Sequence, residues 1–187
     1  SGLDENDQHS ADTSHMWLPD QTDTAAWIQF ELAQPKKLDR IQVWNHNSQT
    51  EGVLGFGTKE ALIEYSADGE TWSEMGIVEI AQAPGRESYT GSSIALGSIV
   101  AQYLKITPQS NWSILPAITQ AGLSEVRFYA IPVQAREPMP ADGSISSGVD
   151  ITLQWRSGRE AVEHEVVFST DEQAVIDGSA VVATVSE

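Results

Sequence analysis

Apolar and polar residues alternate along Trp27-Ile28-Gln29-Phe30-Glu31-Leu32, so that Ile28, Phe30 and Leu32 fall on one face of an extended chain. The alternation returns, after a turn, in Leu38-Asp39-Arg40-Ile41-Gln42-Val43-Trp44-Asn45. A period of two residues is typical of half-buried strands. These two stretches therefore predict β-strands that each turn one face toward a core.

Further strands follow along the chain. Ala61, Ile63 and Tyr65 alternate with their neighbours, and Ser66-Ala67-Asp68-Gly69-Glu70-Thr71-Trp72 turns the chain back, because Asp-Gly tolerates the positive φ angles of a tight hairpin turn. Other strands are predicted at 73–80, 100–107 and 124–131. Helical periodicity is nearly absent. The expected fold class is all-β, an antiparallel β-sandwich of roughly 130 residues.

The character of the sequence changes after residue 131. Residues 132–143 contain three prolines, and each proline biases the residue before it toward extended or polyproline II backbone. This stretch predicts a linker. We therefore divide the chain into a β-sandwich binding domain at 1–133 and a second part at 134–187.

The second part also has the pattern of strands. Ile151, Leu153 and Trp155 alternate with polar residues, and Val166 and Phe168 share a face. The remaining stretch supplies three or four strands, whereas an immunoglobulin-like sandwich has about seven. The prediction is an incomplete second β-sandwich domain after the linker.

The charge of the chain limits its partners. The formal net charge is −17, with 10 Lys and Arg against 27 Asp and Glu. Nucleic acids and anionic membranes are bound by clustered Lys and Arg, which are scarce here, so no nucleic-acid partner is expected. No run of about 18 apolar residues occurs, so no membrane insertion is expected. The first ten residues lack the features of a signal peptide, and an exported protein would have its signal removed or outside this sequence.

The ordered series of segments at 27–32, 38–45, 63–72, 103–106 and 123–128 resembles the discoidin family, the coagulation factor V/VIII C-type domains. The resemblance implies the jelly-roll, galactose-binding-like form of the β-sandwich. The same fold contains the family 32 carbohydrate-binding modules of secreted glycosidases and bacterial surface proteins. Residues 136–187 resemble the opening of a fibronectin type III or immunoglobulin-like repeat.

The resemblance also implies a metal site, because members of this family often hold one calcium ion between an N-terminal loop and the last strand. Calcium takes six to eight oxygen ligands in flexible geometry. The corresponding loop here is Asp4-Glu5-Asn6-Asp7-Gln8-His9-Ser10, with Glu5 in place of the family's Gly and Ser10 one residue later than its Thr. The implied ligands are Asp4, Asn6, Asp7, Ser10, Ser124 and Glu125. The alternative interpretation is a solvated acidic terminus.

In the carbohydrate-binding branch, loop aromatic residues stack on a sugar while His, Asn and Arg bind its hydroxyls. Two clusters fit this description here, Trp44-Asn45-His46-Asn47 after a strand and Asn111-Trp112-Ser113 between strands, and Trp17 beside His15 and Asp20 is a third possibility. The candidate ligand-binding residues are Trp112, Asn111, His46, Asn47 and Trp17. The alternatives are that a strand tryptophan packs in the core and that polar residues after a strand merely cap it.

The sequence contains no His-Glu-x-x-His pair, no Gly-x-Ser-x-Gly elbow, no phosphate loop and no cysteine. We therefore expect no catalysis from this chain. The predicted function is a non-catalytic, calcium-stabilised carbohydrate-binding module of a secreted or cell-surface protein, with a glycan and other domains of the same chain as partners. The alternative is an adhesive or structural module that binds a protein or a cell surface.

Overall fold

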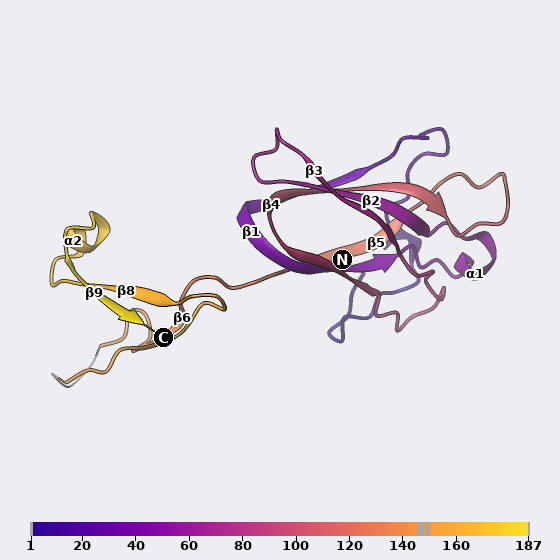
Figure 1. Cartoon of the computed structure of the whole chain (residues 1–187). Helices are drawn as coiled ribbons and strands as arrows, with labels where there is room; N and C mark the ends of the chain where they lie inside the picture. Colours follow the sequence, from indigo (N-terminus) through magenta and orange to yellow (C-terminus); the bar gives the residue numbers. More distant parts are fainter. Residues whose placement is uncertain (1, 146–147, 149, 187) are drawn as a thin grey trace. The chain divides into compact units, whose positions relative to one another are not determined.

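The structure is a computed structural model that describes residues 2–145, 148 and 150–186. The chain divides into two compact units, Ser1–Ile131 and Pro132–Glu187 (Figure 1). The division falls at the start of the stretch predicted as a linker, two residues before the predicted boundary between 133 and 134. In the part of the chain that the structure describes, no helix is long and apolar enough to cross a membrane.

Unit 1 is built on one five-stranded antiparallel sheet with the strand order β3-β2-β4-β1-β5. Its elements, in chain order, are the 3-10 helix η1 (Thr13–His15), β1 (Ile28–Asn45), α1 (Glu51–Leu54), β2 (Thr58–Ser66), β3 (Ser73–Glu79), β4 (Ser92–Asn111) and β5 (Leu123–Ala130).

The long strands β1 and β4 turn this sheet into a sandwich. Residues 28–31 of β1 pair with 103–106 of β4, whereas residues 38–43 pair with 92–99. Register shifts separate the two halves, and such irregularities let a strand bend. One layer therefore contains β2 and β3, and the other contains β5 (Figure 1). The predicted fold class, an all-β antiparallel sandwich, is confirmed.

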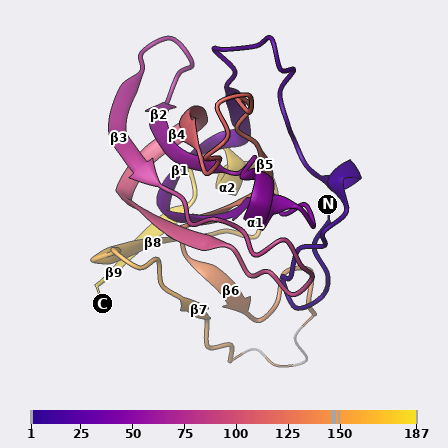
Figure 2. The ribbon, with the colours of Figure 1, turned by 90° about the vertical axis from the view of Figure 1, so that its right-hand side faces the viewer.

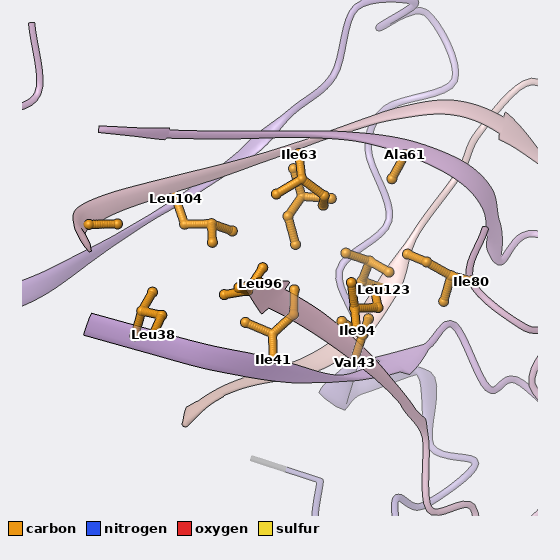
Figure 3. Packing of buried hydrophobic residues seen from close by; sticks show 12 residues of the cluster. Leu38, Ile41, Val43, Ala61, Ile63, Ile80, Ile94, Leu96, Leu104 and Leu123 are labelled. Carbon is orange, nitrogen blue, oxygen red and sulfur yellow. The ribbon is translucent and has the colours of Figure 1, made fainter. Parts of the chain in front are cut away.

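The core lies between the two layers. Ala61, Ile63 and Leu104 reach it from one side, and Leu38 and Ile41 reach it from the other (Figure 3). The remaining buried members are Val43, Ile80, Ile94, Leu96, Ala101, Ile106 and Leu123. The alternation that predicted the strands thus places their apolar faces in a single core.

Two strands differ from the prediction. The stretches 27–32 and 38–45 belong to one continuous strand, β1, because 33–37 remains extended between them. Strand β4 begins at Ser92, eight residues before the predicted strand, because Ile94 and Leu96 alternate into the core ahead of a bend at Gly97 and Ser98, which both have positive φ.

The predicted hairpin turn between β2 and β3 is held by Asp68. Its Oδ1 accepts hydrogen bonds from the backbone N–H of Thr71 at 2.8 Å, the N–H of Glu70 at 2.9 Å and the Ser66 hydroxyl at 2.9 Å. These donors, the Thr71 N–H first, lower the pKa of Asp68 from 3.8 to about 2. The pattern Ser-x-Asp-Gly at this turn therefore supplies both the acceptor and the tight bend.

We expect an NMR titration to give the Asp68 carboxyl a pKa near the value of about 2. Because the folded pKa lies below the unfolded one, the stability that this carboxylate adds is present above pH 3.8 and is lost as the pH falls through about 2. Asp68→Asn should remove this part of the acid dependence. Titration of Asp68 at its ordinary value would contradict the assignment.

Unit 2 contains two separate two-stranded sheets, β6-β7 and β8-β9. Its elements are β6 (Arg136–Met139), β7 (Gln154–Arg156), β8 (Glu163–Phe168), α2 (Glu172–Ile176) and β9 (Val181–Ser186). Many of its large apolar side chains are exposed, among them Phe168 at 67% and Val181 at 78%. The predicted strands at 151–155 and 166–168 overlap β7 and β8, and the fibronectin-like or immunoglobulin-like identity of this part stays a prediction.

Candidate functional site

A polar pocket lies at the end of unit 1 where the segment before β1 meets the end of β4 and the loop that follows it. Its volume is about 440 Å³. Its lining residues are Pro19, Asp23, Thr24, Ala26, Pro108, Gln109, Ser110, Asn111, Ser113, Thr119 and Ala121. Carboxylate, hydroxyl and amide groups therefore predominate, and Asp23 is the one charged residue of this lining.

Two loops form the walls, and side chains tie them together. We call residues 19–26 the first loop and residues 112–121 the second loop. Gln120 Nε2 donates to the carbonyl of Pro19 at 2.6 Å, and Gln21 Nε2 donates to the carbonyl of Ala117 at 3.4 Å. The Thr119 hydroxyl donates to the carbonyl of Gln21 at 3.4 Å. These three bonds hold the two walls of the pocket together. Figure 2 turns this end of unit 1 toward the viewer.

Asn111, a predicted ligand-binding residue, lines the pocket, but its side-chain amide forms hydrogen bonds with the second loop. Its Nδ2 donates to the carbonyls of Ile118 at 3.0 Å and Gln120 at 2.9 Å, and its Oδ1 accepts from the N–H of Ser113 at 3.0 Å. Three bonds from one side chain fix both ends of the loop. Asn111 thus shapes the wall from which other groups reach a ligand.

Trp112, the predicted stacking residue, is half-buried and is absent from the pocket lining. Its Nε1 donates to the carbonyl of Ile80 at 2.9 Å, and Lys59 Nζ lies 5.0 Å from its ring centroid. These contacts make Trp112 an anchor of the second loop. A more exposed ring belongs to Trp27, which is 56% accessible and directly follows Ala26 of the lining. In the sequence, Trp27 stands out only as the first residue of a predicted strand.

His46 and Asn47 lie inside unit 1, contrary to an exposed ligand-binding role. His46 is 3% exposed, and its Nδ1 is 3.1 Å from Oε2 of the fully buried Glu51. Asn47 Nδ2 donates to the carbonyls of Ser10 at 3.1 Å and Arg86 at 2.8 Å. Polar residues that follow a strand usually face solvent, but here Asn47 satisfies backbone groups of distant segments and His46 pairs with the Glu51 side chain.

Trp17, the third predicted ligand residue, packs against the core and pairs with Leu123 through reciprocal backbone hydrogen bonds of 2.8 and 3.0 Å. Its side chain is half-buried and lines a smaller pocket of about 220 Å³, together with Phe30 and Glu125. Trp17 therefore lies apart from the polar pocket lined by Asp23 and Asn111.

Two of the predicted calcium ligands, Asp4 and Asp7, are engaged by protein groups. Asp4 Oδ1 accepts the N–H groups of Asn6 and Gln8, both at 2.9 Å, and the Gln8 bond is the main cause that lowers the pKa of Asp4. The Asp7 carboxylate pairs with the guanidinium of Arg127. Within residues 2–145, 148 and 150–186, no three His, Asp or Glu side chains gather as a metal-binding group.

The two serines of the predicted metal site also have protein partners. The Ser10 hydroxyl is 3.2 Å from Nδ1 of His15, and the Ser124 hydroxyl donates to the carbonyl of Asn45 at 2.7 Å. With Asp4 and Asp7 engaged as well, this arrangement of side chains does not fit a calcium ion that needs six or more oxygen ligands.

Several solved structures with similar architecture come from bacterial glycoside hydrolases. CBM32-3 of a family 31 glycoside hydrolase from Clostridium perfringens is 21% identical, with 62% of this chain and 74% of that chain covered and a TM-score of 0.46. CpGH89CBM32-5 from the same organism, solved with GalNAc-β-1,3-galactose, is 13% identical over 62% and 75% of the two chains, with a TM-score of 0.48.

A putative chitobiase fragment from Bacteroides thetaiotaomicron is 16% identical over 69% of this chain and 76% of that one, with a TM-score of 0.49. The match to a family 89 glycoside hydrolase from Clostridium perfringens spans 11% of that longer chain. No curated protein matches the sequence.

The family comparison covers most of unit 1. The sequence profile of the F5/8 type C domain matches residues 3–120, which is more than half of the 187 residues. That stretch includes the first loop, β1 to β4 and nearly all of the second loop. The chain belongs to the F5/8 type C domain family, the discoidin domains, which are non-catalytic binding modules.

Proposed function

We propose that unit 1 is a carbohydrate-binding module and that the polar pocket holds its glycan. The observation that carries the proposal is the pocket itself, with carboxylate and hydroxyl groups on two loops that are tied together and amide groups at the end of β4. A sugar offers hydroxyls that both donate and accept, so Asp23, Thr24 and Gln109 can each bind one. The preformed loops lower the entropy cost of binding.

The charge of the pocket favours neutral glycans over acidic ones. Asp23 lines it, and Glu60 lies beside it, accepting a hydrogen bond from the lining residue Ser110 at 2.9 Å. The lining contains neither Lys nor Arg. A uronate or sulfate group would therefore lose its water without gaining an ionic partner, and such desolvation is costly.

Two aspartates of the first loop offer a matched test. Asp20 and Asp23 each accept a backbone N–H two residues ahead, from Thr22 at 2.8 Å and Ala25 at 3.1 Å, but only Asp23 lines the pocket. We expect Asp23→Asn to weaken binding of a neutral glycan by about tenfold or more, the worth of one hydrogen bond to a charged group. Asp20→Asn should leave binding unchanged.

The measurement is a glycan-array screen followed by titration calorimetry of the best neutral ligand and an acidic ligand of similar size. If Asp23→Asn and Asp20→Asn lose glycan affinity equally, the glycan does not bind in this pocket. Failure of the chain to bind any glycan would overturn the proposed function, and tighter binding of acidic glycans would overturn the predicted preference.

A further inference from the structure

The segment at residues 2–10, here called the N-terminal loop, is held to the sandwich at several residues, one of which is Asp7. The carbonyl of Asp7 accepts a hydrogen bond of 3.1 Å from Nε1 of Trp44, whose side chain is 1% exposed. The carboxylate of Asp7 pairs with the guanidinium of Arg127. Arg127 Cζ lies 5.6 Å from the Trp44 ring centroid. The Arg127 guanidinium thus contacts both the N-terminal loop and the Trp44 indole, and this indole itself donates a hydrogen bond to the loop.

Other contacts fix the two ends of the N-terminal loop. Leu3 packs against the buried cluster of Trp44, Ala83 and Tyr89. The N–H of His9 donates to the carbonyl of Tyr89 at 2.8 Å. The loop therefore has an apolar anchor at one end, backbone pairing at the other, and the Arg127 pair between them.

The strand pattern of β5 explains how Arg127 comes to face this loop. Glu125 pairs with Trp44 across the β1–β5 ladder, and Arg127 pairs with Gln42. Residues two apart on a strand share a face, so Arg127 and Glu125 point to the same side of the sheet. A guanidinium at this position supplies positive charge beside two carboxylates, where the family resemblance implies a calcium ion.

We propose that Arg127, rather than a divalent cation, neutralises Asp7 and fixes the N-terminal loop of unit 1. A guanidinium suits this role because its planar fork pairs with a carboxylate and also stacks on an aromatic face. The proposal is independent of glycan binding, because Arg127 and Asp7 are both outside the polar pocket.

The test compares Arg127→Gln with Arg86→Gln in the full chain. Both changes remove one positive charge from an exposed or half-exposed arginine, but the contact of Arg86 with Asn47 is made by its backbone carbonyl. Thermal melts are recorded with millimolar CaCl₂ or with chelator, and hydrogen exchange follows the amides of Asp7 and Gln8. Arg127→Lys tests whether charge alone is sufficient.

We expect the melting temperature of the unaltered chain to differ by less than about 1 °C between calcium and chelator. Arg127→Gln should lower it by roughly 2 to 6 °C and speed exchange in the N-terminal loop, with Arg127→Lys intermediate and Arg86→Gln unchanged. A clear drop in the melting temperature of the unaltered chain on adding chelator would indicate a bound calcium ion and overturn the proposal. So would an Arg127→Gln variant that matches Arg86→Gln in both measurements.

Discussion

Replacing Glu51 with alanine is expected to destabilise unit 1 by about 2 to 5 kcal/mol, because each buried polar group left without a partner costs about 1 to 3 kcal/mol. The Glu51 side chain is completely buried at the first position of α1. Its Oε2 lies 3.1 Å from Nδ1 of His46, and its Oε1 accepts the N–H of Gly57 at 2.8 Å. Truncation leaves both groups buried without a partner.

The destabilisation caused by Glu51→Ala should extend to the walls of the polar pocket. A Cβ at Gly57 would lie 2.9 Å from both Glu51 Oε1 and Asn45 Oδ1, so glycine allows this close approach of backbone to carboxylate. The carbonyl of Gly57 then accepts the N–H of Trp112 at 3.1 Å, at the start of the second loop. Glu51 therefore supports the second loop through Gly57 and Trp112, which do not line the polar pocket.

Urea unfolding followed by tryptophan fluorescence measures this effect. Glu79→Ala is the matched control, because Glu79 is an exposed residue of β3 and its truncation should change the free energy of unfolding by less than about 0.5 kcal/mol. Glu51→Gln keeps an acceptor for Gly57 and should lose less than Glu51→Ala. A loss below about 1 kcal/mol in Glu51→Ala would show that the pair contributes little.

The sequence predicted the sandwich well because the signal for it is local. Alternation along 28–32 and 38–43 indicates directly which residues face the core. Asp68-Gly69 indicates a turn, because that turn depends on only a few neighbouring residues. The first half of β4 was missed because it contains several small residues and Gly97, which weaken the strand pattern before the bend.

The candidate site was only partly predictable, because it depends on contacts between distant segments. Asp23 and Ser113 line the same pocket although about ninety positions separate them, and no local pattern joins them. Asn47 and Trp112 resemble ligand residues in sequence, yet each is used to hold backbone groups far along the chain. Only Asn111 was both predicted and found in the lining.

The two units should differ most in hydrogen exchange. Strand β1 has a neighbour on each side, β4 and β5, and its apolar face lies in the core. Among the residues that the structure describes, strands β8 and β9 pair only with each other, and every residue of β9 is exposed. A two-stranded hairpin alone is marginally stable in water. We expect ladder amides of β1 to exchange at least about 1,000-fold more slowly than those of β8 and β9.

The edge strand β3 is a control for the faster exchange expected in β8 and β9. It tests whether that faster exchange comes merely from lying at the edge of a sheet. It also has one neighbour, β2, and several exposed residues, but it belongs to the five-stranded sheet. Its amides that bond to β2 should therefore exchange more slowly than the paired amides of β8 and β9, because opening them exposes part of a shared core. Exchange of the full chain, read residue by residue by NMR, makes the comparison. Equal protection of the β8–β9 ladder and of β1 would show that unit 2 is stabilised by contacts beyond its own two-stranded sheets.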